Sequence, residues 1–120
     1  MNFSVLIVPV GASAAFKPDL AGAQPGQPLG VVSKDNVTWY NTTDLEHQPW
    51  PTNGAGGAML TEAQARAAGV YLSDPVAPGS PSAPTFNVNP TDESQTTIFY
   101  GCAKHSADPT ERSSIVITTS

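Results

Sequence analysis

The chain has 120 residues, enough for one ordinary domain with a hydrophobic core, and we expect a single domain over residues 1–120. Ten acidic residues against five Lys and Arg give a formal net charge of −5, which argues against nucleic acid or an anionic membrane surface as the main partner. The single cysteine excludes an internal disulfide, and no apolar run approaches the ~20 residues of a membrane-spanning helix.

The first regular segment is predicted at Phe3–Val10. Its β-branched residues and the glycine that follows favour a β-strand. The same run, followed by the small residues at 12–14, also resembles a signal peptide, but Met1 and Asn2 supply none of the positive charge that a leader carries. A first strand is therefore the favoured interpretation.

The other predicted strands are short and are bordered by turn residues. In Val37–Asn41 alternate residues share one face, as expected for a half-buried strand that leads towards His47. Further strands are expected at 85–90, 96–100 and 114–119. The strand at 96–100 delivers the only cysteine of the chain.

One helix is predicted, at Thr61–Ala68. Thr61 and Gln64 have the spacing of a capping box, and Gly69 is a good C-terminal stop. About six short strands, this one helix and the absence of an internal repeat indicate an all-β protein. We predict a Greek-key β-sandwich.

The residues with the most distinctive chemistry are Cys102 and the only two histidines, His47 and His105. A lone buried cysteine is usually a small hydrophobe, and a lone histidine is usually a surface or hydrogen-bonded residue. Here, however, each histidine follows a predicted strand, and a His2Cys set is the trigonal ligand set of blue-copper electron-transfer sites. Zinc normally needs a fourth strong ligand in a closed site, and none is obvious. A catalytic Cys/His dyad is favoured less.

Several segments in order resemble a small cupredoxin of the plastocyanin type. Phe16-Lys17-Pro18 is similar to the Phe-x-Pro turn of that family, and Val37–Asn41 with His47 six residues later resembles the strand and loop that carry the first copper histidine. Tyr100–His105 resembles the Tyr-x-Cys-x-x-His loop, and Ser114–Ile117 resembles the closing strand. The resemblance covers nearly the whole chain. It implies one copper ion per chain.

The same resemblance implies that His47, Cys102 and His105 are the equatorial copper ligands. The family pattern also places a methionine after the second histidine, with four residues between them, but this position holds Thr110 and no methionine follows Cys102. Met59 lies in a glycine-rich interval, where we expect a loop or core role. The axial ligand of the family is therefore missing from its usual place.

Four axial arrangements stay open: an oxygen of Thr110, the carboxylate of Glu111, the backbone carbonyl of Glu46, or no axial ligand. A hard carboxylate would favour Cu(II), lower the potential and move the site from blue towards red or green copper. We favour Thr110 or no ligand, because Glu111 reads as a solvated loop acid beside Arg112.

The resemblance implies a soluble, monomeric carrier of single electrons rather than an enzyme. His105 is expected near the surface as the electron port, and Pro49, Trp50, Pro51 and Pro109 are candidates for an apolar collar around it. For Trp50 a position in the core is an equal alternative. The expected partner is a redox protein, a cytochrome or a copper oxidoreductase, met in transient contacts. The alternatives are an atypical copper site with a catalytic or small-ligand-binding role, and a copper-binding module without a redox cycle. We also expect an exported, periplasmic protein whose leader has been removed or replaced by Met1.

Overall fold

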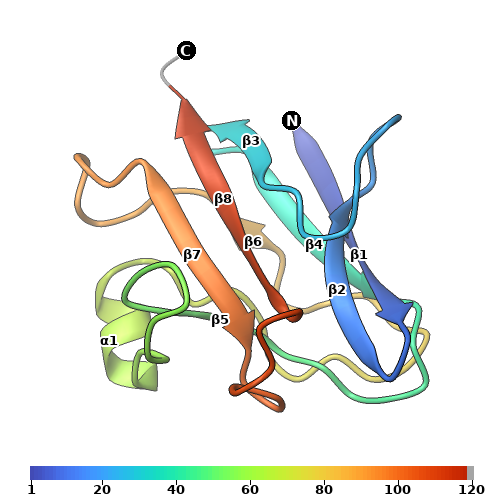
Figure 1. The fold of residues 1–120 in the computed structure, drawn as a ribbon. Coiled ribbons are helices and arrows are strands. Elements are labelled where there is room, and N and C mark those ends of the chain that lie inside the picture. The colour runs from blue at the N-terminus through green and yellow to red at the C-terminus, as the bar shows by residue number, and fades with distance from the viewer. Residues whose placement is uncertain (119–120) are drawn as a thin grey trace.

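Two four-stranded sheets face each other in the computed structural model, which describes residues 1–118 (Figure 1). The strands are β1 (Asn2–Val10), β2 (Ser13–Pro18), β3 (Leu29–Val32), β4 (Asn36–Asn41), β5 (Pro49–Pro51), β6 (Phe86–Asn87), β7 (Thr97–Cys102) and β8 (Arg112–Thr118), and the helix is α1 (Glu62–Ala67). One sheet has the order β2-β1-β4-β6 and the other β3-β8-β7-β5. The predicted all-β sandwich with one short helix is confirmed.

The strand pairing mixes parallel and antiparallel neighbours. β1 runs parallel to β4 and β3 runs parallel to β8, whereas the other neighbours are antiparallel. Parallel neighbours require the chain to cross from one edge or layer to another instead of turning back directly. The long connections that result form loops at the end of the sandwich opposite residues 1 and 118 (Figure 1).

Most of the sequence-based strands appear where they were expected. Val37, Trp39 and Asn41 are buried on one face of β4, as the alternation predicted. The strand predicted at 85–90 is shorter, since only Phe86–Asn87 pairs with β4. The strand predicted at 114–119 begins earlier, at Arg112, and Thr119 lies outside the described residues.

The helix has the predicted ends. Thr61 is the N-cap, and its hydroxyl accepts from the N–H of Gln64 while the Gln64 side chain accepts from the N–H of Thr61, so the capping box is complete. Ala68 is the C-cap, and Gly69 follows with a positive φ of 71°. Among the described residues no helix is long and apolar enough to cross a membrane.

An aromatic cluster joins the two sheets in the core. The ring centroids of Phe16 from β2 and Tyr100 from β7 lie 4.8 Å apart. Trp39 from β4 meets Tyr100 edge to face, and its Nε1–H donates to the Tyr100 hydroxyl at 3.2 Å. All three side chains are buried. Since Tyr100 faces the core, Cys102, two residues further along the same strand, also faces inward.

Candidate metal centre

Four side chains with metal-binding atoms meet at one end of the sandwich. Cys102 is the last residue of β7, and His47 lies in the connection between β4 and β5. His105 and Glu111 lie in the segment that joins β7 to β8. The ligand atoms of these four residues all lie within 4.8 Å of one another. The fold therefore brings together the two histidines and the cysteine predicted from the sequence.

The two loops meet because β5 pairs with β7. Pro49 lies opposite Cys102 in that pairing, so the residues just before Pro49 reach the end of β7. Two backbone contacts continue the connection, since the N–H of Gln48 points at Cys102 Sγ at 3.4 Å and the N–H of Ala103 donates to the Gln48 carbonyl at 2.9 Å. His47, next to Gln48, is thereby held beside the thiol.

The distances around the sulfur suit a shared metal ion. Cys102 Sγ lies 3.7 Å from Nδ1 of His47 and 3.6 Å from Nδ1 of His105. A metal with bonds of about 2.3 Å to sulfur and about 2.0 Å to nitrogen, at angles between tetrahedral and trigonal, separates the two donor atoms by about 3.5–3.7 Å. The two sulfur-to-imidazole distances therefore suit ligation of one shared metal ion.

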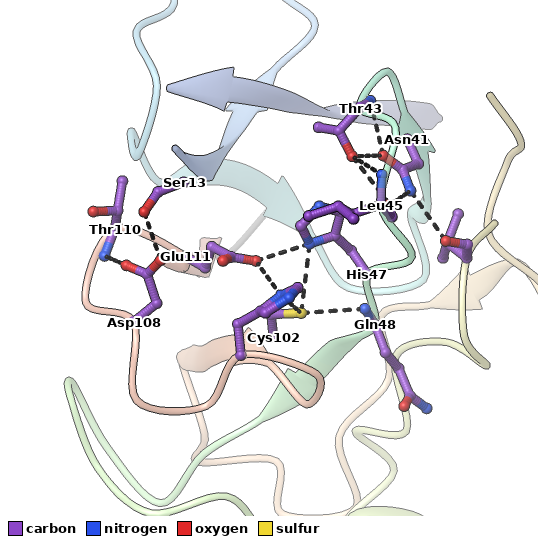
Figure 2. Close-up of polar contacts among 12 residues, drawn as sticks. Ser13, Asn41, Thr43, Leu45, His47, Gln48, Cys102, Asp108, Thr110 and Glu111 are labelled. Atoms are coloured by element: carbon purple, nitrogen blue, oxygen red, sulfur yellow. Dashed lines mark hydrogen bonds and ion pairs between the residues drawn. The ribbon is translucent and has the colours of Figure 1, made fainter. Parts of the chain in front are cut away.

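Glu111 is the fourth member of the cluster. Its Oε1 lies 2.8 Å from Nδ1 of His47 and 3.1 Å from Nδ1 of His105 (Figure 2). The residue is only 3% exposed. The expectation that Glu111 is a solvated loop acid is therefore wrong. Its neighbour Arg112 does not pair with it but donates to the backbone carbonyls of Gly57 and Ser106.

The other two candidates for an axial contact have different surroundings. Thr110 is exposed, and its N–H donates to the Asp108 carboxylate at 2.9 Å. The side chain of Glu46 is exposed and pairs with Lys104 at 3.2 Å, across the outside of the two ligand loops. The Glu46 carboxylate does not belong to the cluster of donor atoms, and the Glu46 backbone carbonyl as an axial contact stays a prediction. The structure thus brings Glu111, and not Thr110, to the two imidazoles.

Burial differs sharply between the two histidines. The His47 side chain is 2% exposed, whereas the His105 side chain is 35% exposed. Nε2 of His47 is buried and has no hydrogen-bond partner among the described residues, so Nδ1 makes the polar contacts of this ring. His105 is the ring of the cluster that reaches the surface.

The environment of the thiol opposes its ionisation in the metal-free protein. Burial raises the pKa of the Cys102 thiol, and the nearby charge of Glu111 raises it further, while the N–H groups that point at the sulfur, chiefly that of Gln48, lower it. A cation bound at the cluster would favour the thiolate, because the thiolate and not the thiol is the metal ligand.

Asn41 orders the loop that carries His47, a role that the sequence reasoning missed. Its side-chain amide donates to the carbonyls of Leu45 at 2.7 Å and Val76 at 3.1 Å. Its side-chain oxygen accepts from the N–H of Thr43 at 2.9 Å, which forms an Asx turn (Figure 2). An asparagine at the end of a strand, two residues before a threonine, was the available signal.

Three of the four candidates do not form the expected apolar collar, and Trp50 takes the buried position that was its alternative. Pro49, Trp50 and Pro51 form β5 and are buried there, so they do not surround His105 at the surface. Pro109 is exposed. A cavity of about 260 Å³ lies beside the cluster instead, and it is lined by the tip of the β1–β2 hairpin, residues 43–45 and three members of the cluster.

Solved structures give the comparison with known proteins, since no protein-family model and no curated protein matches the chain. A purple cupredoxin from Nitrosopumilus maritimus superposes with a TM-score of 0.61 at 16% identity, over 96% of this chain and 98% of that one. A reduced Cu(I) form of an amicyanin mutant gives 0.53 at 16% identity, over 96% of this chain and 82% of that one. For a copper nitrite reductase from Nitrosomonas europaea the TM-score is 0.51 at 19% identity, and 99% of this chain corresponds to 41% of that one.

Proposed function

We propose that this chain, which has the cupredoxin fold, is a mononuclear copper protein that carries single electrons between redox partners. The observation that carries the proposal is the convergence of Cys102 with His47 and His105, at distances that suit a shared metal ion. Glu111 is proposed as a fourth, carboxylate ligand to the same ion. The centre would then differ from a blue-copper site in its fourth ligand, a carboxylate oxygen.

Copper is favoured over zinc by the fold. The sequence argument against zinc was the lack of a fourth strong ligand, and Glu111 removes that argument, because a Cys, two His and a carboxylate satisfy a four-coordinate zinc site. The fold neighbours support copper, since one of them is described as a Cu(I) form and another as a copper nitrite reductase. Thiolate and imidazole are suitable ligands for both oxidation states of copper.

The protein contributes a mostly buried set of ligand side chains, of which only the His105 ring is partly exposed. Copper would supply the one-electron couple. Cys102, His47 and Glu111 are buried, and strand pairing between β5 and β7 fixes the first two relative to each other, so little movement would accompany a change of charge. His105, with its partly exposed ring, is the proposed port through which the electron enters and leaves.

The partner is proposed to be a redox protein with a basic docking surface, either a cytochrome or a copper oxidoreductase. Two acidic residues, Asp44 and Asp108, line the cavity beside the exposed His105 ring. Leu45, 55% exposed next to Asp44, offers an apolar contact at the same end. Complementary charge of this kind accelerates encounter without requiring a large interface. The monomeric state and the export of the protein stay predictions.

Copper titration of the metal-free protein tests the proposal. We expect one equivalent of Cu(II) to give an intense visible band and an axial or rhombic paramagnetic resonance signal, and reversible reduction in voltammetry. Cys102→Ser should abolish the visible band, because the band arises from the thiolate. An unchanged band in that variant would overturn the site, and tighter binding of Zn(II) than of copper would overturn the choice of metal.

A second candidate, an atypical copper site that binds a small molecule, is favoured by the cavity. The lining of this cavity includes His47, His105 and Glu111 but no Lys or Arg. Its acidic lining disfavours anions and suits a neutral ligand. Addition of nitric oxide and, separately, of azide to the copper-loaded protein distinguishes the candidates: a spectral change with nitric oxide supports ligand binding, and no change with either supports electron transfer alone.

A further inference from the structure

The segment that carries two of the proposed ligands has little regular structure of its own. Between the end of β7 and the start of β8, successive turns connect His105 N–H to the Cys102 carbonyl at 3.2 Å, Asp108 N–H to the His105 carbonyl at 3.0 Å, and Glu111 N–H to the Asp108 carbonyl at 3.3 Å. Among residues 1–118, none pairs as a strand with residues 103–111. The position of Glu111 therefore depends on what anchors these turns.

Asp108 is the anchor on the side of the cavity. One oxygen of its carboxylate accepts from the N–H of Thr110 at 2.9 Å, and the other accepts from the hydroxyl of Ser13 at 2.7 Å (Figure 2). Both contacts converge on the same side chain, which precedes Glu111 by three residues. Asp108 thus fixes the last turn before the buried carboxylate.

Ser13 is a firm attachment point because it belongs to the opposite sheet. It is the first residue of β2 and pairs with Val10 across the tight β1–β2 hairpin. The turn contains Gly11 with a positive φ of 58°, a conformation that favours glycine. The Ser13–Asp108 hydrogen bond therefore ties the ligand segment of one sheet to a hairpin of the other.

Arg112 holds the same segment from its other side. Its guanidinium donates to the Ser106 carbonyl at 2.6 Å and to the Gly57 carbonyl at 2.9 Å. With this second attachment intact, loss of the Ser13 hydrogen bond would shift the turns without releasing them. Loss of the Ser13 hydrogen bond is therefore expected to displace Glu111, and this should affect the centre less than removal of the Glu111 carboxylate.

We propose that Ser13 and Asp108 are positioning residues that set the distance between the Glu111 carboxylate and the two imidazoles, and so tune the metal centre. The proposal rests on the proposed copper site for its spectroscopic consequences. Its geometric part concerns the contacts of Glu111 with His47 and His105, which are contacts between side chains of the protein.

Four variants test the proposal in the copper-loaded protein. Ser13→Ala removes the hydrogen bond to Asp108, Ser13→Thr keeps a hydroxyl, and Glu111→Gln alters the carboxylate itself. Ser94→Ala is the control, because it removes a similar hydrogen bond, 2.6 Å from Ser94 to Asp92, in a loop outside the cluster. We expect Ser13→Ala to shift the visible band, the copper hyperfine coupling and the potential in the direction of Glu111→Gln, but by less. Ser13→Thr and Ser94→Ala should match the parent protein.

The metal-free protein gives a second readout that does not need copper. We expect Ser13→Ala to move the imidazole ¹⁵N resonances of His105 and His47 in nuclear magnetic resonance, while Ser13→Thr and Ser94→Ala leave them in place. Unchanged resonances in Ser13→Ala, in a protein where Glu111→Gln does move them, would overturn the inference. Failure of the parent protein to bind copper would overturn the proposed function. The imidazole resonances would still decide whether Ser13 and Asp108 position Glu111.

Discussion

Oε1 of Glu111 lies 2.8 Å from Nδ1 of His47, and both side chains are almost completely buried. The same oxygen lies 3.1 Å from Nδ1 of His105. A single carboxylate oxygen therefore faces both imidazoles that point at the Cys102 sulfur. As the proposed fourth ligand, this hard carboxylate would favour Cu(II) in the proposed copper centre.

Glu111→Gln should raise the reduction potential of the copper-loaded protein. Removal of the charge weakens the preference for Cu(II), and a ten- to hundredfold change in that preference corresponds to a rise on the order of 60–120 mV. Glu46→Gln is the matched control, because Glu46 is an exposed acid near the ligand loops that pairs with Lys104 instead of an imidazole. Film voltammetry measures both, and equal shifts would mean that Glu111 acts only through general charge.

Copper should stabilise the fold through Cys102. A ligand that binds only the folded state, present at about a thousand times its dissociation constant, adds about 4 kcal/mol to the free energy of unfolding. Thermal unfolding followed by circular dichroism, with and without one equivalent of copper, measures the effect. Cys102→Ser should lose most of the stabilisation, and an equal rise in melting temperature in this variant would place copper elsewhere on the chain.

Tyr100→Phe should destabilise the protein at neutral pH and less so in alkali. The variant leaves the buried Nε1–H of Trp39 without its acceptor, which costs about 1–3 kcal/mol. Burial also raises the pKa of Tyr100 above its usual range, so the folded protein keeps a proton that the unfolded chain releases near pH ~10. The stability that depends on the neutral phenol is full below that pH and is lost as the pH rises.

The difference in free energy of unfolding between the parent and Tyr100→Phe should therefore shrink between pH 7 and pH ~10.5, because only the parent loses stability as this phenol ionises in the unfolded chain. Urea unfolding at the two pH values measures it. Tyr40→Phe is the control, since Tyr40 is substantially exposed and should change little at either pH. A difference that stayed constant with pH would contradict the role given to burial of the Tyr100 hydroxyl.

Gly101→Ala should destabilise the ligand strand. A Cβ at Gly101 would lie 2.8 Å from Cδ and 2.9 Å from Nε of Arg112, whose guanidinium is held by two backbone carbonyls. Crowding of this kind typically costs about 1–3 kcal/mol. Gly30→Ala is the matched control in a strand of the same sheet, because nothing lies within 4 Å of its added Cβ. Equal urea midpoints for the two variants would show that Arg112 moves aside freely.

Local patterns in the sequence predicted the elements whose stabilising contacts are themselves local. The helix is an example, because its capping box joins Thr61 to Gln64 only three residues away. The burial of Val37, Trp39 and Asn41 on one face of β4 follows from the two-residue period of any strand. β5 was missed since two of its three residues are prolines, which cannot donate to the ladder and are confined to sheet edges.

By itself the sequence determined the sandwich, the helix and the set of three residues, His47, Cys102 and His105, that the loops would bring together. It could not determine the fourth member of the cluster, because Thr110 and Glu111 are adjacent in the sequence. The direction of each side chain depends on turns that Asp108 ties to Ser13, 95 residues away. Only the tertiary structure decided that Glu111 turns inward. The physical reason is that the local turns around Glu111 are anchored by a hydrogen bond between residues far apart in the chain, which no local pattern of the sequence contains.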